Sequence, residues 1–218
     1  MSAMDLPRQL AQRLAQTLPG YRAQNRMEPE LSYGRHCGPA PQSARQAAVI
    51  VLLYPDEGRW HLPLTLRPEH LPDHAGQISL PGGSIDAGET SRQAALRELH
   101  EELGIEAGDV SLLGQLSPLY VWGTNFLVTP WVGATSQRPK WIPSEDEVAE
   151  VLEVPLAHLA DPANISQHAY HRRGIHFTAP HYEFQSHRIW GATAMMLAEL
   201  VEVMREGWRE GGNEGKRE

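Results

Sequence analysis

Residues 82–105 decide the fold of this chain, and their sequence is GGSIDAGETSRQAALRELHEELGI. Thr90 and Gln93 form a capping-box pattern, in which two side chains bind backbone groups at the start of a helix. Gly104 stands where a left-handed residue commonly ends a helix. The stretch therefore predicts a glycine-rich loop that leads into a helix from about residue 90 to residue 103.

Three glutamates of this predicted helix share one face. With about 100° of rotation per residue, Glu98, Glu101 and Glu102 cluster beside a stripe of leucines that is expected to be buried. Arg97 is the only nearby cation, and its position on the wheel points away from Glu98 and Glu102. Clustered carboxylates next to a glycine-rich loop favour Mg²⁺ or Mn²⁺, which bind oxygen ligands and share substrate phosphates. The helix alone favours the competing interpretation, a solvated, glutamate-rich surface.

The spacing of the whole stretch resembles the signature of the Nudix hydrolases at every fixed position. Gly83 is followed after five residues by Glu89, and after seven more by residues 97–105, RELHEELGI. The resemblance implies an α/β/α sandwich with a mixed β-sheet and a loop–helix–loop catalytic motif. It also implies a metal-dependent hydrolase that cuts the pyrophosphate of a nucleoside diphosphate linked to another group.

The same resemblance implies roles for individual residues. Four groups would hold the metal: the carboxylates of Glu98 and Glu102, that of Glu101 at a second site or through water, and the carbonyl of Gly83. Glu89 and Arg97 would hold the loop and the helix in register. A carboxylate base usually assists attack by water. It would lie on the helix or on a later loop, where Glu147 and Glu150 are the candidates, with a solvated acidic turn as the competing interpretation of that pair.

Residues 62–83, LPLTLRPEHLPDHAGQISLPGG, resemble a further motif that marks the coenzyme A pyrophosphatase branch of this family. The positions in step are Leu64, Thr65, Arg67, Gly76 and Pro81-Gly82-Gly83; the positions that depart are Pro68, Pro72 and Leu80. The branch implies cleavage of coenzyme A or acyl-CoA to 3′,5′-ADP and 4′-phosphopantetheine. Arg67 is then the predicted phosphate-contacting cation, or else a surface arginine that ends a strand. The backbone of Gly82 would approach the phosphates closely.

Other functions stay open. Residues 189–194, IWGATA, also resemble relatives that hydrolyse ADP-ribose, and Pro72 removes a cation that could meet a phosphate. ADP-ribose, NADH or another nucleoside diphosphate derivative is therefore the rival substrate. A module that senses a nucleotide without cutting it is the alternative of a different class, although it would be expected to lose signature glutamates. RNA decapping is weaker still, because the chain is acidic and lacks a basic stripe.

The composition sets the expected class of partner. The chain has 218 residues and a formal charge of −8, which argues against duplex DNA or an anionic membrane. A single cysteine, Cys37, excludes an internal disulfide and fits a reducing compartment. No secretory signal or stretch of ~18 apolar residues is present in the sequence. We therefore expect a cytoplasmic protein with a small nucleotide substrate, and homodimerisation through the N-terminal helix stays open.

The remaining pattern predicts one α/β domain with an N-terminal extension. The boundaries are 1–46 for a leucine-spaced helix and a polar lead-in, 47–204 for the Nudix domain and 205–218 for a frayed tail. Strands are expected at 47–54, 60–67, 110–116, 126–132 and 148–154, with a long helix at 190–204. Pro63 in the second strand suggests an edge or a bulge.

Residues 161–186 are predicted to be a histidine-rich loop. Its histidines have irregular spacing and no accompanying cysteine, so ordinary exposed residues are favoured over a zinc site. Four tryptophans could stack on adenine, although such residues more often fill a core: Trp122, Trp131, Trp141 and Trp190.

Overall fold

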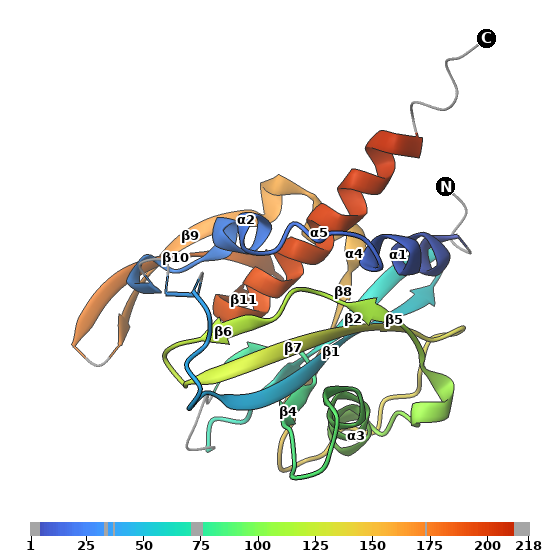
Figure 1. The fold of residues 1–218 in the computed structure, drawn as a ribbon, viewed down its shortest axis with the longest axis horizontal. Helices are drawn as coiled ribbons and strands as arrows, with labels where there is room; N and C mark the ends of the chain where they lie inside the picture. Colours follow the sequence, from blue (N-terminus) through green and yellow to red (C-terminus); the bar gives the residue numbers. More distant parts are fainter. Residues whose placement is uncertain (1–4, 33–34, 37, 71–75, 173, 212–218) are drawn as a thin grey trace.

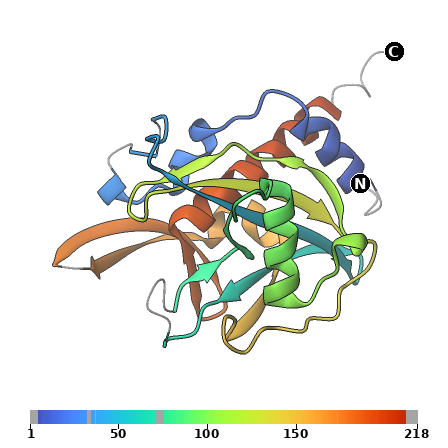
Figure 2. The same cartoon turned by 60° about the horizontal axis from the view of Figure 1, so that its bottom comes forward.

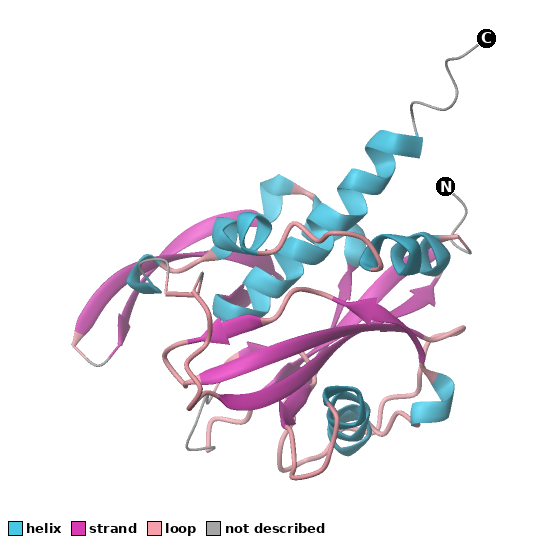
Figure 3. Ribbon diagram, in the orientation of Figure 1, coloured by secondary structure: helices cyan, strands magenta, loops and turns pink. Residues whose placement is uncertain are grey.

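The structure, a computed structural model, describes residues 5–32, 35–36, 38–70, 76–172 and 174–211. A mixed β-sheet forms its middle layer (Figure 1). Helix α3 (Ser91–Leu103) packs on one face of the sheet. Helices α1 (Leu6–Leu14), α2 (Tyr21–Gln24) and α5 (Gly191–Gly211) lie on the other face (Figure 3). The predicted α/β/α sandwich is confirmed.

The central sheet has the strand order β3-β2-β1-β7-β5, with β4 also paired to β1, β6 to β7 and β8 to β2. The strands are β1 (Arg45–Asp56), β2 (Arg59–Leu66), β3 (Ile78–Ser79), β4 (Gly82–Ser84), β5 (Ser111–Gln115), β6 (Leu119–Val121), β7 (Phe126–Ala134) and β8 (Glu150–Pro155). β1 and β7 are parallel, whereas β1 is antiparallel to β2 and β4. The sheet is therefore mixed, as the sequence predicted.

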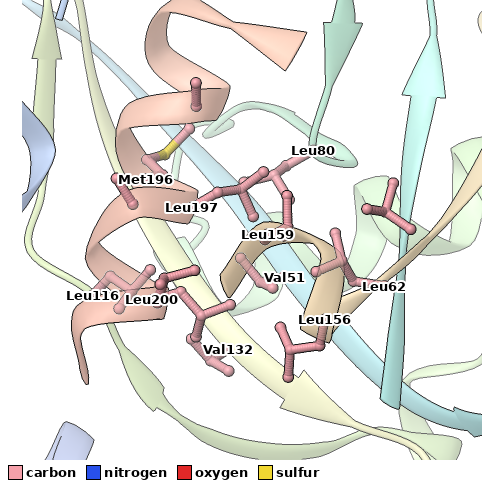
Figure 4. Close-up of a cluster of buried hydrophobic side chains, with 14 of the residues drawn as sticks. Val51, Leu62, Leu80, Leu116, Val132, Leu156, Leu159, Met196, Leu197 and Leu200 are labelled. Atoms are coloured by element: carbon pink, nitrogen blue, oxygen red, sulfur yellow. The ribbon is translucent and has the colours of Figure 1, made fainter. Parts of the chain in front are cut away.

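Strand β1 is apolar throughout its centre because it is covered on both faces. Val51 and Leu53 belong to the larger core, which includes α5, whereas Ile50 and Leu52 belong to the core beneath α3. Figure 4 shows Val51 facing the same cluster as Leu197 and other residues of α5. Side chains alternate across a strand, so a run without polar residues is what a doubly covered strand requires.

Pro63 lies inside the sheet, in a local gap between two ladders. On one side of β2 the pairing with β1 ends at His61, and the pairing with β3 starts at Thr65. On the other side Pro63 stands opposite Glu153 of β8. A proline has no backbone N–H to donate. The interval between His61 and Thr65 is therefore where β2 can contain a proline without losing a hydrogen bond of either ladder. The strand is not the edge that the proline suggested.

The N-terminal residues contribute to the main core. Helix α1 ends at Leu14 and does not continue to Leu18, which packs against the core from outside the helix. The predicted polar lead-in contains α2 and two short 3₁₀ helices, η1 (Asn25–Met27) and η2 (Glu30–Ser32). Met27 is buried among core residues that include α5. The local sequence did not indicate that this region is buried, because isolated apolar residues show no helical or strand period.

The prediction of a histidine-rich loop at 161–186 is wrong. Residues there form β9 (Ile165–Arg172) and the whole of β10 (Ile175–Phe184). The second sheet has the order β11-β10-β9, with β11 at His187–Trp190. One face of this sheet turns Tyr182 and Phe184 into the main core. The sequence did not show the apolar–polar alternation of a strand, because the face away from the core carries histidines and aromatic residues in place of plainly polar ones.

Several short elements were not predicted. They are β3, β4, β6, α4 (Leu156–Ala160) and the 3₁₀ helices η3 (Ala107–Asp109) and η4 (Pro162–Asn164). Elements of two to five residues are too short to display a helical or strand period.

The last helix is longer than expected. Helix α5 continues to Gly211, past residue 204 where the sequence predicted its end. Residues 212–218, Cys37 and Pro72 lie outside the described residues. No helix in the described part of the chain has the length and apolar character to cross a membrane.

Candidate active site

The glycine-rich loop lies directly against the central strand. Gly82 and Gly83 open β4, which pairs with Val49 and Ala48 of β1. A Cβ atom on Gly82, whose φ is 152°, would lie 2.4 Å from the carbonyl oxygen of Ala48. Only glycine therefore permits this approach of loop to strand.

Helix α3 begins and ends as predicted. The Thr90 hydroxyl accepts a hydrogen bond from Gln93 N at 3.3 Å, and the Gln93 side chain accepts one from Thr90 N at 2.9 Å. Gly104 adopts a left-handed conformation with φ of 71°, and its N–H donates to His100 O at 2.8 Å. These caps fix both ends of the helix and hence the direction of its glutamates. Figure 2 shows α3 lying across the sheet.

The three helix glutamates differ greatly in burial. Glu102 is buried, with 3% of its surface exposed, whereas the Glu98 side chain is 14% exposed and that of Glu101 is 50% exposed. Glu102 Oε1 accepts a long hydrogen bond from Gly82 N, and Oε2 accepts one from Thr65 Oγ1, both at 3.4 Å. The most buried of the three helix carboxylates is thus only weakly bound.

Burial and like charge destabilise the ionised form of this buried pair. The pKa of Glu102 is raised to about 8, chiefly by burial and also by the charges of Glu98 and Glu147, against the hydrogen bond from Gly82. Burial also raises the pKa of Glu98, although the bond from Arg97 opposes it. A cation held between such carboxylates would relieve both costs.

Arg97 contacts Glu98, one of the two glutamates from which it was predicted to point away, and also Glu101. Its Nη1 donates to Glu98 Oε1 at 2.9 Å and to Glu101 Oε2 at 2.8 Å. Its Nε and Nη2 donate to Glu89 at 3.0 and 3.1 Å, and Nη2 also donates to Ser84 O at 3.0 Å. The prediction failed because a wheel gives only the direction of Cβ, whereas the long arginine side chain curls back along the helix. These bonds join loop and helix.

The oxygen donors suit a divalent cation. Within the described residues no three His, Cys, Asp or Glu side chains are grouped so that they could hold a metal ion. Glu98 and Glu102 nevertheless lie one helical turn apart, and a Cβ on Gly83 would fall 2.4 Å from Glu98 Oε1, so this backbone lies against the carboxylate. Carboxylate and carbonyl oxygens are what Mg²⁺ and Mn²⁺ prefer.

A second loop brings one further carboxylate to the site. Ser144 N donates to the backbone oxygen of Glu102 at 3.0 Å, and Ala149 N donates to Leu66 O at 2.8 Å. Between these anchors lies Glu147, whose charge raises the pKa of both Glu98 and Glu102. Glu150 instead has its carboxylate 3.4 Å from His187 Nε2. Of the two loop glutamates, Glu147 is the one that faces the pair.

The NUDIX domain model matches residues 44–173, which include the loop, α3 and Glu147. The chain belongs to the Nudix family. An uncharacterized Nudix hydrolase, NudL, from Salmonella paratyphi B is 40% identical over 160 residues, covering 72% of this chain and 81% of that protein. The counterpart from Salmonella newport matches equally. The crystal structure of the Nudix hydrolase RenU from M. smegmatis shares the fold with a TM-score of 0.54 and 20% identity, covering 83% of this chain and 94% of RenU.

This Nudix hydrolase is a pyrophosphohydrolase that acts on a phosphorus-containing anhydride, in a small nucleoside diphosphate derivative. Nudix hydrolases generally use divalent metal ions, which agrees with the donor set at Glu98 and Glu102.

Arg67 lies beside the Nudix helix. Its N–H donates to Gln77 O at 3.0 Å, its carbonyl accepts from Gly76 N at 3.1 Å, and its charge lowers the pKa of Glu102. Its Nε is buried and makes no hydrogen bond within the part of the chain that the structure describes. A buried guanidinium nitrogen without an acceptor is available to an anionic ligand.

Thr65 and Ser79 are site residues that the sequence did not assign. The two hydroxyls lie 3.1 Å apart, and Thr65 also donates to Glu102. Thr65 was part of the recognised Leu-Thr-x-Arg pattern, so its presence was noted but not its role. No sequence pattern pointed to Ser79, because it is brought to Thr65, and through Thr65 to Glu102, only by the pairing of β2 with β3.

The four tryptophans have different surroundings. Trp131 donates to Ser91 Oγ at 3.3 Å, Trp141 packs edge-on to Tyr54, and Trp122 lies under the guanidinium of Arg35. Trp190 stacks on another aromatic ring of the second sheet. Trp190 is therefore the tryptophan placed in an aromatic surface near the start of α5.

Proposed function

We propose that this Nudix hydrolase cleaves coenzyme A or an acyl-CoA to 3′,5′-ADP and 4′-phosphopantetheine, with Mg²⁺ or Mn²⁺ as cofactor. The observation that carries the proposal is the position of Arg67, which belongs to the 62–83 motif. Its buried Nε makes no hydrogen bond within the described residues, and its charge lowers the pKa of Glu102. A pyrophosphate bound to a metal ion at Glu102 would meet this guanidinium, which could neutralise its negative charge.

The oxygen donors around Glu98 and Glu102 support the following binding roles. Glu98 and Glu102 would hold the cation, with the Gly83 carbonyl as a further ligand and Glu101 as a second-site or water-mediated ligand. When bound, such a cation neutralises phosphate oxygens and lowers the pKa of coordinated water. The backbone of Gly82 and the guanidinium of Arg67 would orient the pyrophosphate.

The reaction is an in-line hydrolysis. The oxygen of water forms a bond to one phosphorus, the bond from that phosphorus to the bridging oxygen breaks, and the other phosphate leaves with the electron pair. Glu147 would accept the proton of the attacking water as general base. Its place on the anchored 144–149 turn, close enough to shift the pKa of Glu98 and Glu102, supports this role.

The rival substrate is ADP-ribose or NADH. The shared residues 189–194 favour it, and Thr193 of that segment donates to Ile78 O at 3.0 Å, next to the catalytic elements. A nucleotide-sensing module without activity is disfavoured, because all the signature glutamates are present.

Mass spectrometry of products tests the proposal. Purified protein is incubated with CoA, ADP-ribose, NADH and a nucleoside triphosphate, each with Mg²⁺, with Mn²⁺ or with chelator. Metal-dependent 3′,5′-ADP and phosphopantetheine are expected. AMP from ADP-ribose or NADH with CoA intact would refute the CoA assignment and leave the Nudix chemistry.

Matched variants test the base. Glu147→Gln should lower kcat by about 10²–10⁴-fold, the usual contribution of a general base. Glu145→Gln, an exposed change in the same turn, should leave kcat unaltered. Equal activity of both variants would exclude Glu147 as the base.

A further inference from the structure

The second sheet has one face in the core and one face outside it. Tyr182, Phe184 and Ile189 point into the main core. Residues of the opposite face alternate with them along the same strands, because successive side chains point to opposite sides. Figure 1 shows β9 and β10 extending from the body of the protein beyond α2. We call this opposite face, carrying His168, Tyr170, Phe177, Ala179, His181, Glu183, Arg188 and Trp190, the aromatic face.

An aromatic stack forms at the centre of the aromatic face. Ala179 occupies the middle strand and is fully buried, so Tyr170 of β9 and Trp190 of β11 can meet above it. Their ring centroids are 4.4 Å apart at 26°, and Tyr170 also stacks on Phe177 at 5.6 Å and 18°. Both Tyr170 and Trp190 keep part of their surface exposed. A planar aromatic ligand could extend such a stack.

Polar groups around the stack lack partners. The Tyr170 hydroxyl and both ring nitrogens of His181 are buried and make no hydrogen bond among the described residues. His181 is 1% exposed, and its Nε2 is 3.5 Å from a carboxylate oxygen of Glu183. Buried polar side chains are nearly always hydrogen-bonded, so these groups are suited to a ligand that supplies donors and acceptors.

The aromatic face carries Arg188, which stands opposite Glu183 of β10 on the same face. Counted over both faces and the connecting turns, residues 165–190 contain three arginines, five histidines and one glutamate, whereas the whole chain carries a formal charge of −8. Arg188 Nη1 lies 3.4 Å from His168 Nε2, and His168 packs edge-on to Tyr170. An anion beside the stack would meet these two side chains together.

Direct contacts connect this sheet to the catalytic elements. Three residues after Trp190, Thr193 bonds to Ile78 of β3, and the neighbouring Ser79 contacts Thr65, which donates to Glu102. The strand that carries Trp190 therefore leads directly into a helix that is hydrogen-bonded to β3, the strand paired with Thr65.

We propose that the aromatic face binds the nucleoside end of the substrate, with the purine stacked on the Trp190–Tyr170 pair and a nucleotide phosphate held by Arg188 and His168. The inference rests on the proposed function only in that the substrate is a nucleotide carrying a phosphate besides the pyrophosphate. For 3′,5′-ADP that group is the 3′-phosphate, and AMP lacks it.

Calorimetric titration of AMP and 3′,5′-ADP into the full chain with Mg²⁺ tests the inference. Trp190→Leu should raise the Kd of both ligands by about tenfold, the usual effect of losing one base stack. Arg188→Gln should raise the Kd of 3′,5′-ADP at least about fivefold more than that of AMP. The control is Arg59→Gln, a change of an exposed arginine that stands opposite Asp56 in the central sheet and not in the second sheet. It should change the Kd of neither ligand.

Kinetics with whichever substrate the wild type cleaves provide the second readout. KM should rise in Trp190→Leu with any such substrate and in Arg188→Gln with CoA, which carries the 3′-phosphate, while kcat is retained, because both residues bind the nucleoside end and not the reacting phosphorus. Circular dichroism verifies folding, and if Trp190→Leu is unfolded, the exposed Arg188 variant decides.

The two proposals fail separately. Wild-type Kd and KM values in folded Trp190→Leu and Arg188→Gln would overturn the nucleoside site and leave the hydrolase assignment. A wild type that binds 3′,5′-ADP in a Trp190-dependent way but does not cleave CoA would overturn the proposed substrate and support the nucleoside site.

Discussion

Glu199 of α5 is the buried carboxylate on which the N-terminal region depends. It is completely buried, and it accepts hydrogen bonds from Gly20 N at 3.0 Å, from Gln24 Nε2 at 2.8 Å and from Ser117 N at 3.2 and 3.3 Å. One side chain thus joins the segment after α1, helix α2 and the end of β5 to the last helix. We predict that Glu199→Gln destabilises the whole domain and not only its N-terminus.

The magnitude follows from the number of donors. A hydrogen bond to a charged group contributes about 1.5–3 kcal/mol and a neutral one about 0.5–1.5 kcal/mol. Glu199→Gln keeps the shape of the side chain but replaces charged bonds with neutral ones and one acceptor oxygen with a donor. With three donating groups, the loss is about 1 kcal/mol each, or about 3 kcal/mol in all.

Urea unfolding followed by tryptophan fluorescence and far-ultraviolet circular dichroism measures this loss. With a slope of about 2–3 kcal/mol/M, the midpoint should fall by about 1–1.5 M. The matched control is Glu202→Gln, one turn later on the same helix, which loses only a pair with Arg26, itself 53% exposed. That change should cost less than about 1 kcal/mol. Equal midpoints for the two variants would refute the argument that Glu199 anchors the N-terminal region.

Three further predictions concern the site and an ion pair. Glu98→Gln should reduce turnover by at least about 10²-fold without lowering the melting temperature, measured by product release and calorimetry; unchanged turnover would exclude Glu98 as a metal ligand. Gly83→Ala should weaken Mn²⁺ binding, measured by titration, because its Cβ would fall 2.4 Å from Glu98 Oε1, whereas Gly82→Ala should chiefly lower stability through its clash with Ala48. Burial would raise the pKa of Glu153, but bonds from Arg138 and the Tyr54 hydroxyl bring it below its ordinary value. Its stabilisation should therefore be present above about pH 4.5 and be lost as the pH falls through the folded-state pKa, so acid unfolding of Glu153→Gln should depend less on pH than that of wild type.

The loop–helix–loop was predictable because its signals are local. Thr90, Gln93 and Gly104 act within one turn of the helix end, so their geometry follows from sequence spacing alone. The central strand was equally clear, since an unbroken apolar run has few other uses. The short strands and the β9–β10 hairpin were not predictable, because their residues obtain stability from partners far along the chain.

The candidate site was predicted as a set of residues but not as an arrangement. The wheel placed Glu98, Glu101 and Glu102 on one face correctly, yet it could not give their burial, which depends on β1 and the glycine loop packing over the helix. It also misplaced Arg97, whose reach exceeds what a Cβ direction describes. Thr65 joined the site through strand register, which no local pattern encodes.

By itself the sequence determined the family and the bounds of the helix that carries the three glutamates, and it predicted oxygen ligands for a divalent cation, because cap spacing, helical period and donor chemistry depend on residues that are close together in the chain. Only the tertiary structure decided which carboxylate is buried, that Glu147 rather than Glu150 faces the pair, and that Glu199 anchors the N-terminal region. It also placed Tyr170 and Trp190 in one stack. These outcomes depend on burial and on register between distant strands, which are properties of the packed chain and not of any single segment.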